Sequence, residues 1–464
     1  MAVDPQAYRP ARTLLTLGDG FYDAVRGADF PDAQLRFRND RAAAEVGLDT
    51  LDDDEWVRHL ARFEPLPGTL DQPLALRYHG HQFRVYNPDI GDGRGFTFAQ
   101  LHDRSGRLMD LGTKGSGQTP WSRFGDGRLT LKGGVREILA TEMLEALGVP
   151  TSRTLSLVET GEALERSDEP SPTRSAVLVR LSHGHVRIGT FQRLAFHRDE
   201  DGLRRLTGYA LRHLYGEDSD DPVRLLELVV ERTALLAARY MAAGFVHGVL
   251  NSDNINVTGE SFDYGPWRFA PTWDPAFVAA YFDHAGLYAF GRQPEAILWD
   301  AMQLATSLRL IAEAEPLIAA LDRFAEFYQP AVSAAILWRM GREPRGADAD
   351  RTLVQIVERT LRSSGIGIDR FFFDAFAQDL PASYGEEWAG VRDALSGHAS
   401  RADRSAAYWQ GEPCSMLIEE VEAIWSAIAE TDDWRPLELK VSAIRTLGAA
   451  LAPHPPFRTA EIAG

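Results

Sequence analysis

The chain has 464 residues, of which 44% are hydrophobic and 10% aromatic, and a formal net charge of −18 at pH 7. This length suffices for two or three ordinary domains or for one large two-lobed domain. The acidic charge argues against general binding to nucleic acids or anionic membranes, because phosphate groups need positive patches. It is compatible with a local basic pocket for a small phosphate ligand.

Cysteine and hydropathy patterns exclude further classes. Cys414 is the one cysteine, so an intramolecular disulfide and a Cys-rich metal site are both excluded. No apolar run approaches the roughly 20 residues of a membrane-spanning helix. The first residues lack the basic stretch and apolar core of a secretory signal. We therefore expect a cytoplasmic protein that binds neither nucleic acid nor membranes, and the oligomeric state stays open.

The first part of the chain is mixed and then rich in short β-type runs. We expect residues 1–70 to form an N-terminal extension packed on the rest, with a short helix at 40–46. Residues 71–190 contain runs typical of strands at 96–101, 107–114, 154–158 and 175–181. Among them lies a helical pattern at 135–148, VREILATEMLEALG, which Gly148 ends. Strands around one central helix predict a nucleotide-binding lobe.

Lys114 stands out because lysine is rare in this chain. Only three of the 49 basic residues are lysines, which leaves 49 − 3 = 46 arginines. Lys114 ends a predicted strand, and Glu137 lies in the first turn of the predicted helix. In kinase-like lobes such a pair holds ATP phosphates, because the helix carboxylate aims the flexible ammonium. The alternative is a solvated strand-end charge beside an ordinary first-turn acid.

The sequence G-D-G-R occurs twice in this part, at 91–94 and 125–128. Glycine allows backbone N–H groups to approach phosphate oxygens, which favours an anion-binding loop. The alternative for each copy alone is a tight turn. Further on, Arg180 and Arg187 lie in and after an apolar run, where an unpaired charge is costly. A phosphate and a neighbouring carboxylate are equally good partners for them.

After residue 190 the pattern becomes helical, and residues 191–464 are expected to form a helical lobe. A long amphipathic pattern at 222–244 leads directly to HGVLNSDNINVTGESFDYG, residues 247–265. His247, Asn254 and the D-Y-G that begins at Asp263 keep the order of a kinase metal loop, whereas Val249 replaces the catalytic aspartate. Asn254 and Asp263 offer the hard oxygen ligands that Mg²⁺ prefers. Turn formation alone explains the residue types but not their order.

Other common chemistries have no support. The sequence contains no G-x-S-x-G of a serine hydrolase, no H-E-x-x-H of a zinc peptidase and no G-x-G-x-x-G of a dinucleotide-binding fold.

Taken together, these segments resemble the selenoprotein O family over about residues 70–305. The similar segments are GHQF at 80–83, GDGR at 91–94, KGSGQTPWSRFGDGR at 114–128, VREILATE at 135–142, HGVLNSDN with DYGP at 247–266, and DPAFVAAYFDHAGLYAFGRQP at 274–294. Residues 84–90, RVYNPDI, depart from the glycine-rich family pattern, and little resemblance is visible beyond about residue 330.

The resemblance implies an α+β, two-lobed protein-kinase-like fold, with a β-rich N-lobe around one central helix and a larger, mainly helical C-lobe. It also implies a protein adenylyltransferase that binds ATP in an inverted orientation. Such an enzyme transfers AMP to Ser, Thr or Tyr hydroxyls of proteins with Mg²⁺, or Mn²⁺ in its place. The alternatives are a phosphotransferase, which Val249 disfavours, and an ATP-binding pseudokinase without catalysis.

The resemblance also implies roles for individual residues. Lys114, Arg180 and Arg187 would hold the outer phosphates, and Glu137 would orient Lys114. Asn254 and Asp263 would hold the metal, with Asp263 also at the nucleotide, and Asp253 would accept the proton. The remaining nucleotide-site residues would be Gly91, Gly93, Arg94, Asp126 and Gly127.

Overall fold

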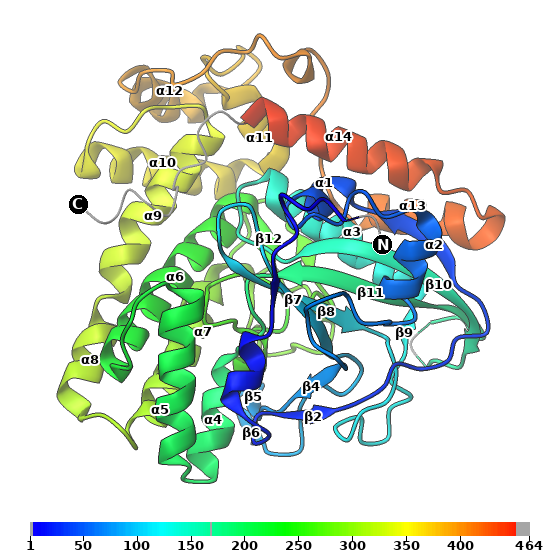
Figure 1. Cartoon of the computed structure of the whole chain (residues 1–464). Helices are drawn as coiled ribbons and strands as arrows, with labels where there is room; N and C mark the ends of the chain where they lie inside the picture. Colours follow the sequence, from blue (N-terminus) through cyan, green and yellow to red (C-terminus); the bar gives the residue numbers. More distant parts are fainter. Residues whose placement is uncertain (1–2, 168, 452–464) are drawn as a thin grey trace.

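The computed structural model describes residues 3–167 and 169–451, which form an α+β architecture with one large antiparallel sheet beside a helical region (Figure 1). The order of the main path through the sheet is β2-β4-β7-β8-β11-β10-β3, with β1 paired to β7 and β9 paired to β11. These strands are β1 (Pro10–Ala11), β2 (Tyr22–Ala24), β3 (Gln34–Arg38), β4 (Leu74–Leu76), β7 (Thr97–His102), β8 (Leu108–Lys114), β9 (Leu129–Thr130), β10 (Arg153–Leu164) and β11 (Thr173–Ser182).

The predicted strands at 96–101, 107–114, 154–158 and 175–181 correspond to β7, β8, β10 and β11. Residues 1–70 contribute three strands to the same sheet, as well as α1 (Asp40–Ala44) and α2 (Asp53–Leu60). In the described residues, two small two-stranded sheets lie outside it: the hairpin of β5 (Gly80–Gln82) with β6 (Val85–Asn87), and β12 (Phe245–Val246) with β13 (Arg268–Phe269).

Alternation along β11 separates the two buried faces of the sheet. Val177 and Val179 face the cluster around Trp56, whereas Leu178 faces the core that includes α3. Because successive side chains of a strand point to opposite faces, Arg180 shares the face of Leu178. The register places Leu178 opposite Lys114, so both cations lie on the α3 side of the sheet.

The central helix α3 (Leu131–Ala146) begins four residues earlier than predicted. The hydroxyl of Thr130 caps it by accepting a hydrogen bond from the backbone N–H of Gly133. The expectation that Glu137 lies in the first turn was therefore wrong, since the helix already has a full turn before it. Gly133 and Gly134, which precede the predicted helix, lie inside α3, and Gly134 allows close packing, because a Cβ there would lie 2.4 Å from Leu157.

The helical region is built around α6 (Pro222–Ala243), which packs against α7, α8 and α9 (Figure 1). Asp221 caps its start, Pro222 occupies the first turn, and Gly244 ends it at a φ of 69°. The predicted helix at 222–244 is thus confirmed. The other helices are α4 (Ile188–Phe196), α5 (Glu200–Tyr209), α7 (Gln293–Leu308), α8 (Ala314–Asp322), α9 (Phe324–Arg339), α10 (Ala347–Ser364), α11 (Ile368–Ala375), α12 (Ala389–Ser396), α13 (Ile418–Thr431) and α14 (Arg435–Leu451).

Among the described residues, no helix combines the length and apolar character needed to cross a membrane. The last described helix, α14, returns to the sheet side of the molecule and packs on α3 (Figure 1). There Arg445 donates two hydrogen bonds, of 2.7 and 2.8 Å, to the buried carboxylate of Glu142. Asn39, the cap of α1, donates to the same carboxylate over 3.2 Å.

We predict that Arg445→Ala lowers the free energy of unfolding by about 2 kcal/mol, because it leaves the buried Glu142 carboxylate without its main partner. Denaturant unfolding followed by circular dichroism measures this change. The control is Arg435→Ala on the same helix, which removes a surface ion pair and should change the free energy of unfolding far less. Equal effects of the two substitutions would contradict the role of this contact.

Candidate active site

A cavity of about 620 Å³ lies where the end of β8, the middle of β11, the two G-D-G-R segments and the 247–265 loop meet. Most of the site residues predicted from the sequence line it. They are Gly91, Gly93, Arg94, Lys114, Asp126, Gly127, Arg180, Arg187, Asp253 and Asp263. Glu137 lies beneath it, bonded to Lys114. Asn254 does not line the cavity but directly follows Asp253, which does.

Lys114 connects three elements at the buried end of the site. Its Nζ donates to Oε2 of Glu137 on α3 over 2.7 Å and lies 3.0 Å from Oδ1 of Asp263. Lys114 and Glu137 are 4% and 0% exposed. Burying such charges is tolerable only with close partners, so the carboxylates fix the position of the ammonium.

Arg180 and Arg187 extend this positive cluster. Nη1 of Arg180 lies 3.7 Å from Glu137 and 3.8 Å from Asp263, too far for a hydrogen bond, and its buried Nε and Nη1 find no hydrogen-bond partner among the described residues. Arg187 donates to Oδ1 of Asp92 over 3.1 Å and to the backbone oxygen of Asp253 over 3.0 Å. Buried, unpaired guanidinium donors that face a cavity suit an anionic ligand.

Asp263 is held in an unusual backbone conformation, with a φ of 63° that non-glycine residues rarely adopt. Burial would raise the pKa of its carboxyl, but Lys114, Arg180 and Arg187 outweigh this effect and hold the pKa well below its ordinary value. The carboxylate is therefore charged at neutral pH. His247 supports the preceding residue, because its Nε2 bonds to the backbone oxygen of Phe262 over 3.0 Å.

Asp253, whose backbone oxygen accepts a hydrogen bond from Arg187, is 7% exposed. Burial raises the pKa of its carboxyl to about 6, although Arg187 and Gln82 act in the other direction. A Cβ on Gly80 would come within 2.7 Å of its Oδ1, so only glycine leaves room for this carboxylate. A buried carboxylate at the cavity wall with a raised pKa has the properties of a proton acceptor.

The glycines of the two G-D-G-R segments are needed by the protein itself. A Cβ on Gly91 would lie 2.6 Å from the Trp121 ring, and one on Gly93 would lie 2.9 Å from the Trp121 carbonyl oxygen. Gly127 has a φ of 72° and sits against the backbone of Gly117. Ser122 links the two segments, because its hydroxyl donates to the Gly93 carbonyl oxygen and its own carbonyl oxygen accepts from the Gly125 N–H. Both segments therefore belong to one wall of the cavity.

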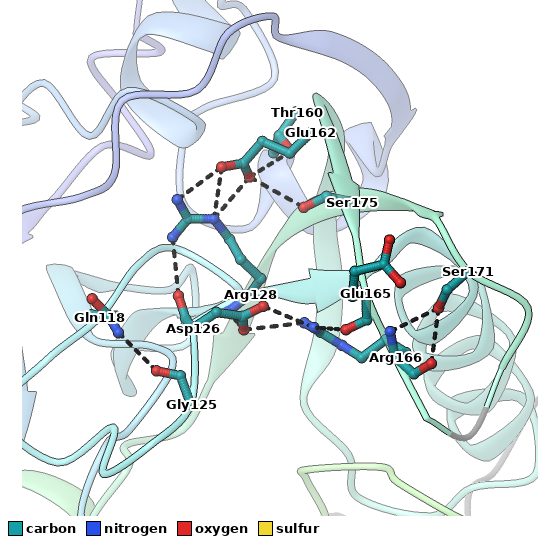
Figure 2. A network of polar contacts seen from close by, with 10 residues as sticks. All are labelled: Gln118, Gly125, Asp126, Arg128, Thr160, Glu162, Glu165, Arg166, Ser171 and Ser175. Carbon is teal, nitrogen blue, oxygen red and sulfur yellow. Dashed lines mark hydrogen bonds and ion pairs between the residues drawn. The ribbon is translucent and has the colours of Figure 1, made fainter.

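Asp126 is committed to contacts within this wall (Figure 2). Its carboxylate accepts hydrogen bonds from the Arg166 guanidinium at 2.8 and 3.1 Å and from the backbone N–H of Arg128. Arg128 in turn binds Glu162, which lies on β10. The turn that follows β10 therefore holds the second G-D-G-R segment in place.

Several cavity residues carried no signal in the sequence. Tyr78 lies under the Arg187 guanidinium, 4.2 Å from ring centre to Cζ. Arg166 comes from a surface turn 40 residues after its partner Asp126. Gln82 and Asp92 also line the cavity. They lie in the GHQF and GDGR segments, and membership of these segments was the one sequence signal that could have suggested them.

The described residues include no group of three or more His, Cys, Asp and Glu side chains placed to hold a metal ion. The donor set that suits a hard cation is smaller: the Asp263 carboxylate and the side-chain oxygen of Asn254. The Asn254 amide nitrogen donates to the Val249 backbone oxygen over 3.0 Å, which orients the amide. Two protein oxygens with phosphate oxygens as further ligands are typical of a nucleotide-bound Mg²⁺.

Comparisons with known proteins agree with this site. The family described as protein adenylyltransferase SelO matches residues 6–411, well beyond the region of about 70–305 where the resemblance was visible. A protein nucleotidyltransferase YdiU of Synechococcus elongatus is 44% identical, covering 93% of each chain. The YdiU protein of Synechocystis is 41% identical over 92% of this chain and 96% of its own, and that of Azotobacter vinelandii 35% identical over 88% and 82%. The chain therefore belongs to the SelO family of protein adenylyltransferases.

Proposed function

We propose that this protein transfers AMP from ATP to Ser, Thr or Tyr hydroxyls of other proteins in a magnesium-dependent reaction. We also propose that its fold is the two-lobed protein-kinase-like fold, with the nucleotide-binding lobe at 71–190, the helical lobe at 191–464 and residues 1–70 as an extension. Family membership supports the reaction type, and the geometry of the cavity supports the arrangement of the nucleotide.

The observation that carries the proposal is the buried group of Lys114, Arg180 and Arg187. These cations are 4%, 5% and 3% exposed and line the cavity together. If the adenine ring occupied this place, the three buried cations would face an uncharged group, and their lost hydration would not be compensated. The β- and γ-phosphates match them, so the nucleotide enters with its phosphates inward and its α-phosphate nearer the mouth.

Asn254 and Asp263 would hold the Mg²⁺, or Mn²⁺ in its place. When bound, the cation neutralises phosphate charge and helps the leaving group depart. The protein contributes the fixed ligand positions: Asp263 is held by Lys114 and by its own backbone conformation, and Asn254 by the Val249 carbonyl oxygen. Residues of both glycine segments, Arg94 among them, line the cavity, and backbone N–H groups of such segments would suit the phosphates.

Asp253 would accept the proton of the acceptor hydroxyl. The hydroxyl oxygen then forms a phosphoester bond with the α-phosphorus, the α–β anhydride bond breaks, and pyrophosphate leaves. Val249 stands where a kinase has its base, and its partly buried aliphatic side chain cannot accept a proton. A base at Asp253 and none at Val249 favours reaction at the α-phosphorus over the γ-phosphorus.

ATP labelled separately at the α- and γ-phosphates tests this proposal. Incubation with a mixture of soluble bacterial proteins should give labelled protein from α-labelled ATP only. Label from the γ position would show a phosphotransferase instead. ATP binding without label from either position would show a non-catalytic nucleotide-binding protein.

We predict that Asp263→Ala lowers the transfer rate by about 10²–10⁴-fold, because the metal loses its charged ligand and phosphate charge is left uncompensated. ATP binding measured by calorimetry should also lose its dependence on Mg²⁺. Asp71→Ala removes an exposed carboxylate, with 78% of its side chain accessible, and serves as the control. Near-normal transfer by the Asp263 variant would rule out this metal site.

Lys114→Arg should be as inactive as Lys114→Ala. A guanidinium is wider than an ammonium and cannot occupy the position between Glu137 and Asp263. The matched control is Lys132→Arg, whose ammonium pairs with Glu422 at a partly exposed position and should keep full activity. Initial rates of AMP transfer give the comparison, and an active Lys114→Arg enzyme would contradict the assigned geometry.

Asp253→Ala should slow transfer by about 10²–10⁴-fold while the dissociation constant for ATP changes only a few-fold. Val249→Asp should not create kinase activity, because the γ-phosphate would lie among Lys114, Arg180 and Arg187, away from any acceptor. Transfer of γ-label by the Val249→Asp variant would mean that ATP binds in the ordinary kinase orientation. A large loss of ATP affinity in Asp253→Ala would make Asp253 a binding residue rather than the base.

A further inference from the structure

An exposed apolar surface lies beside the loop that carries Asp253. It consists of Phe83, Val85, Tyr281 and Phe282, here named the aromatic ledge. Val85, Tyr281 and Phe282 are 70%, 83% and 42% exposed, and Phe83 is half-buried. The rings are in contact: Phe83 to Phe282 at 5.7 Å and Tyr281 to Phe282 at 5.1 Å between centroids. Exposed aromatic groups that adjoin one another mark interaction sites more often than single exposed residues do.

Hydrogen bonds connect the ledge to the loop that carries Asp253. The backbone N–H of Phe83 donates to Oδ1 of Asn251 over 3.0 Å, and the Tyr288 hydroxyl donates to the same oxygen over 2.8 Å. Phe83 also packs on Tyr288 at 5.0 Å between ring centroids. Asn251 precedes Asp253 by two residues, and Gly80 of the same hairpin touches the Asp253 carboxylate. The ledge and the proton acceptor therefore keep a fixed relative position.

The hairpin register places Val85 on the cavity side. β5 and β6 pair Gln82 with Val85 and His81 with Tyr86. Paired residues of an antiparallel hairpin point to the same face. Gln82 lines the cavity, whereas His81 packs on Trp299 of α7 on the other face. Val85 thus lies beside the cavity and remains exposed there.

The turn of this hairpin holds bulky residues under backbone strain. Phe83 and Arg84 have φ values of 51° and 63°, in a two-residue turn that favours Asn-Gly. Strained positions of this kind persist where the side chains serve a function. The Arg84 Cζ lies 5.3 Å from the centre of the Trp299 ring, whereas the Phe83 ring packs against Phe282.

The ledge adjoins the cavity through Gln82, the cross-strand partner of Val85, but Phe83, Val85, Tyr281 and Phe282 do not line it. A nucleotide within the cavity leaves them uncovered, so the group that covers them belongs to the molecule whose hydroxyl reaches Asp253. We propose that the aromatic ledge binds an extended segment of the acceptor protein through an apolar or aromatic residue close to the modified hydroxyl. This inference rests on the proposed adenylyltransferase function and specifies its substrate.

The test uses synthetic peptides with one central Ser, Thr or Tyr and a systematically varied residue at each flanking position. Transfer from α-labelled ATP measures turnover, and fluorescence anisotropy of labelled peptide with a non-hydrolysable ATP analogue measures binding. The wild-type protein should select Leu, Ile or Phe at one or two flanking positions. Tyr281→Ser combined with Phe282→Ser should raise KM for the selected peptide by about tenfold or more, with unchanged kcat and ATP affinity.

Ile318→Ser and Leu439→Ser are the matched controls, since these apolar residues are 55% and 71% exposed on α8 and α14. They should leave KM for the peptide unchanged. If AMP is transferred without any preference for apolar flanking residues, or equally well by the ledge variant, the docking surface is wrong and the proposed function stands. If selected peptides bind at the ledge but receive no AMP, the docking surface stands and the proposed function is wrong. A wild-type dimer that the ledge variant dissociates would assign the ledge to a second copy and overturn the proposal.

Discussion

The site depends on one buried electrostatic cluster, the contact of Lys114 with Glu137 and Asp263. Each charge is supplied by a different element: the end of β8, the second turn of α3 and the loop after β12. None of them can be removed without leaving a buried charge uncompensated, so the cluster fixes the sheet, the central helix and the metal loop relative to one another. Arg180 joins because the register of β11 against β8 places it on the same face.

Around this cluster, the remaining parts of the site are held by contacts that reach far along the chain. The two glycine segments are linked through Ser122, and Arg166 fastens the second one from the turn after β10 (Figure 2). The hairpin of β5 and β6 contacts Asn251 and lies against the Asp253 carboxylate. The walls of the cavity are thus held by contacts within the protein, and preorganisation of this kind lowers the cost of ordering a ligand.

The sequence predicted those features that depend on local order. The spacing of His247, Asn254 and Asp263 after a long helix indicated the loop, and short β-type runs indicated the strands that carry Lys114 and Arg180. Sequence-based prediction failed where contacts between distant segments determine the structure. Gly133 and Gly134 precede the predicted helix but lie in α3, because Thr130 caps the helix and Gly134 leaves room for Leu157. Asp126 was predicted to line the nucleotide site, but its ion pair with Arg166 was not predicted. That contact forms because the pairing of β10 with β11 brings the turn between them to Asp126. The C-terminal helix α14 carried no local signal for its packing on α3.

The central claim is that ATP binds with its phosphates toward the buried cations. A crystal structure with a non-hydrolysable ATP analogue and Mn²⁺ tests it most directly, because anomalous scattering locates the metal and the density locates the phosphates. The account predicts the γ-phosphate in contact with Lys114, Arg180 and Arg187, the metal on Asn254 and Asp263, and the α-phosphate facing Asp253. An adenine ring in contact with those cations, with the γ-phosphate at the mouth of the cavity, would contradict it.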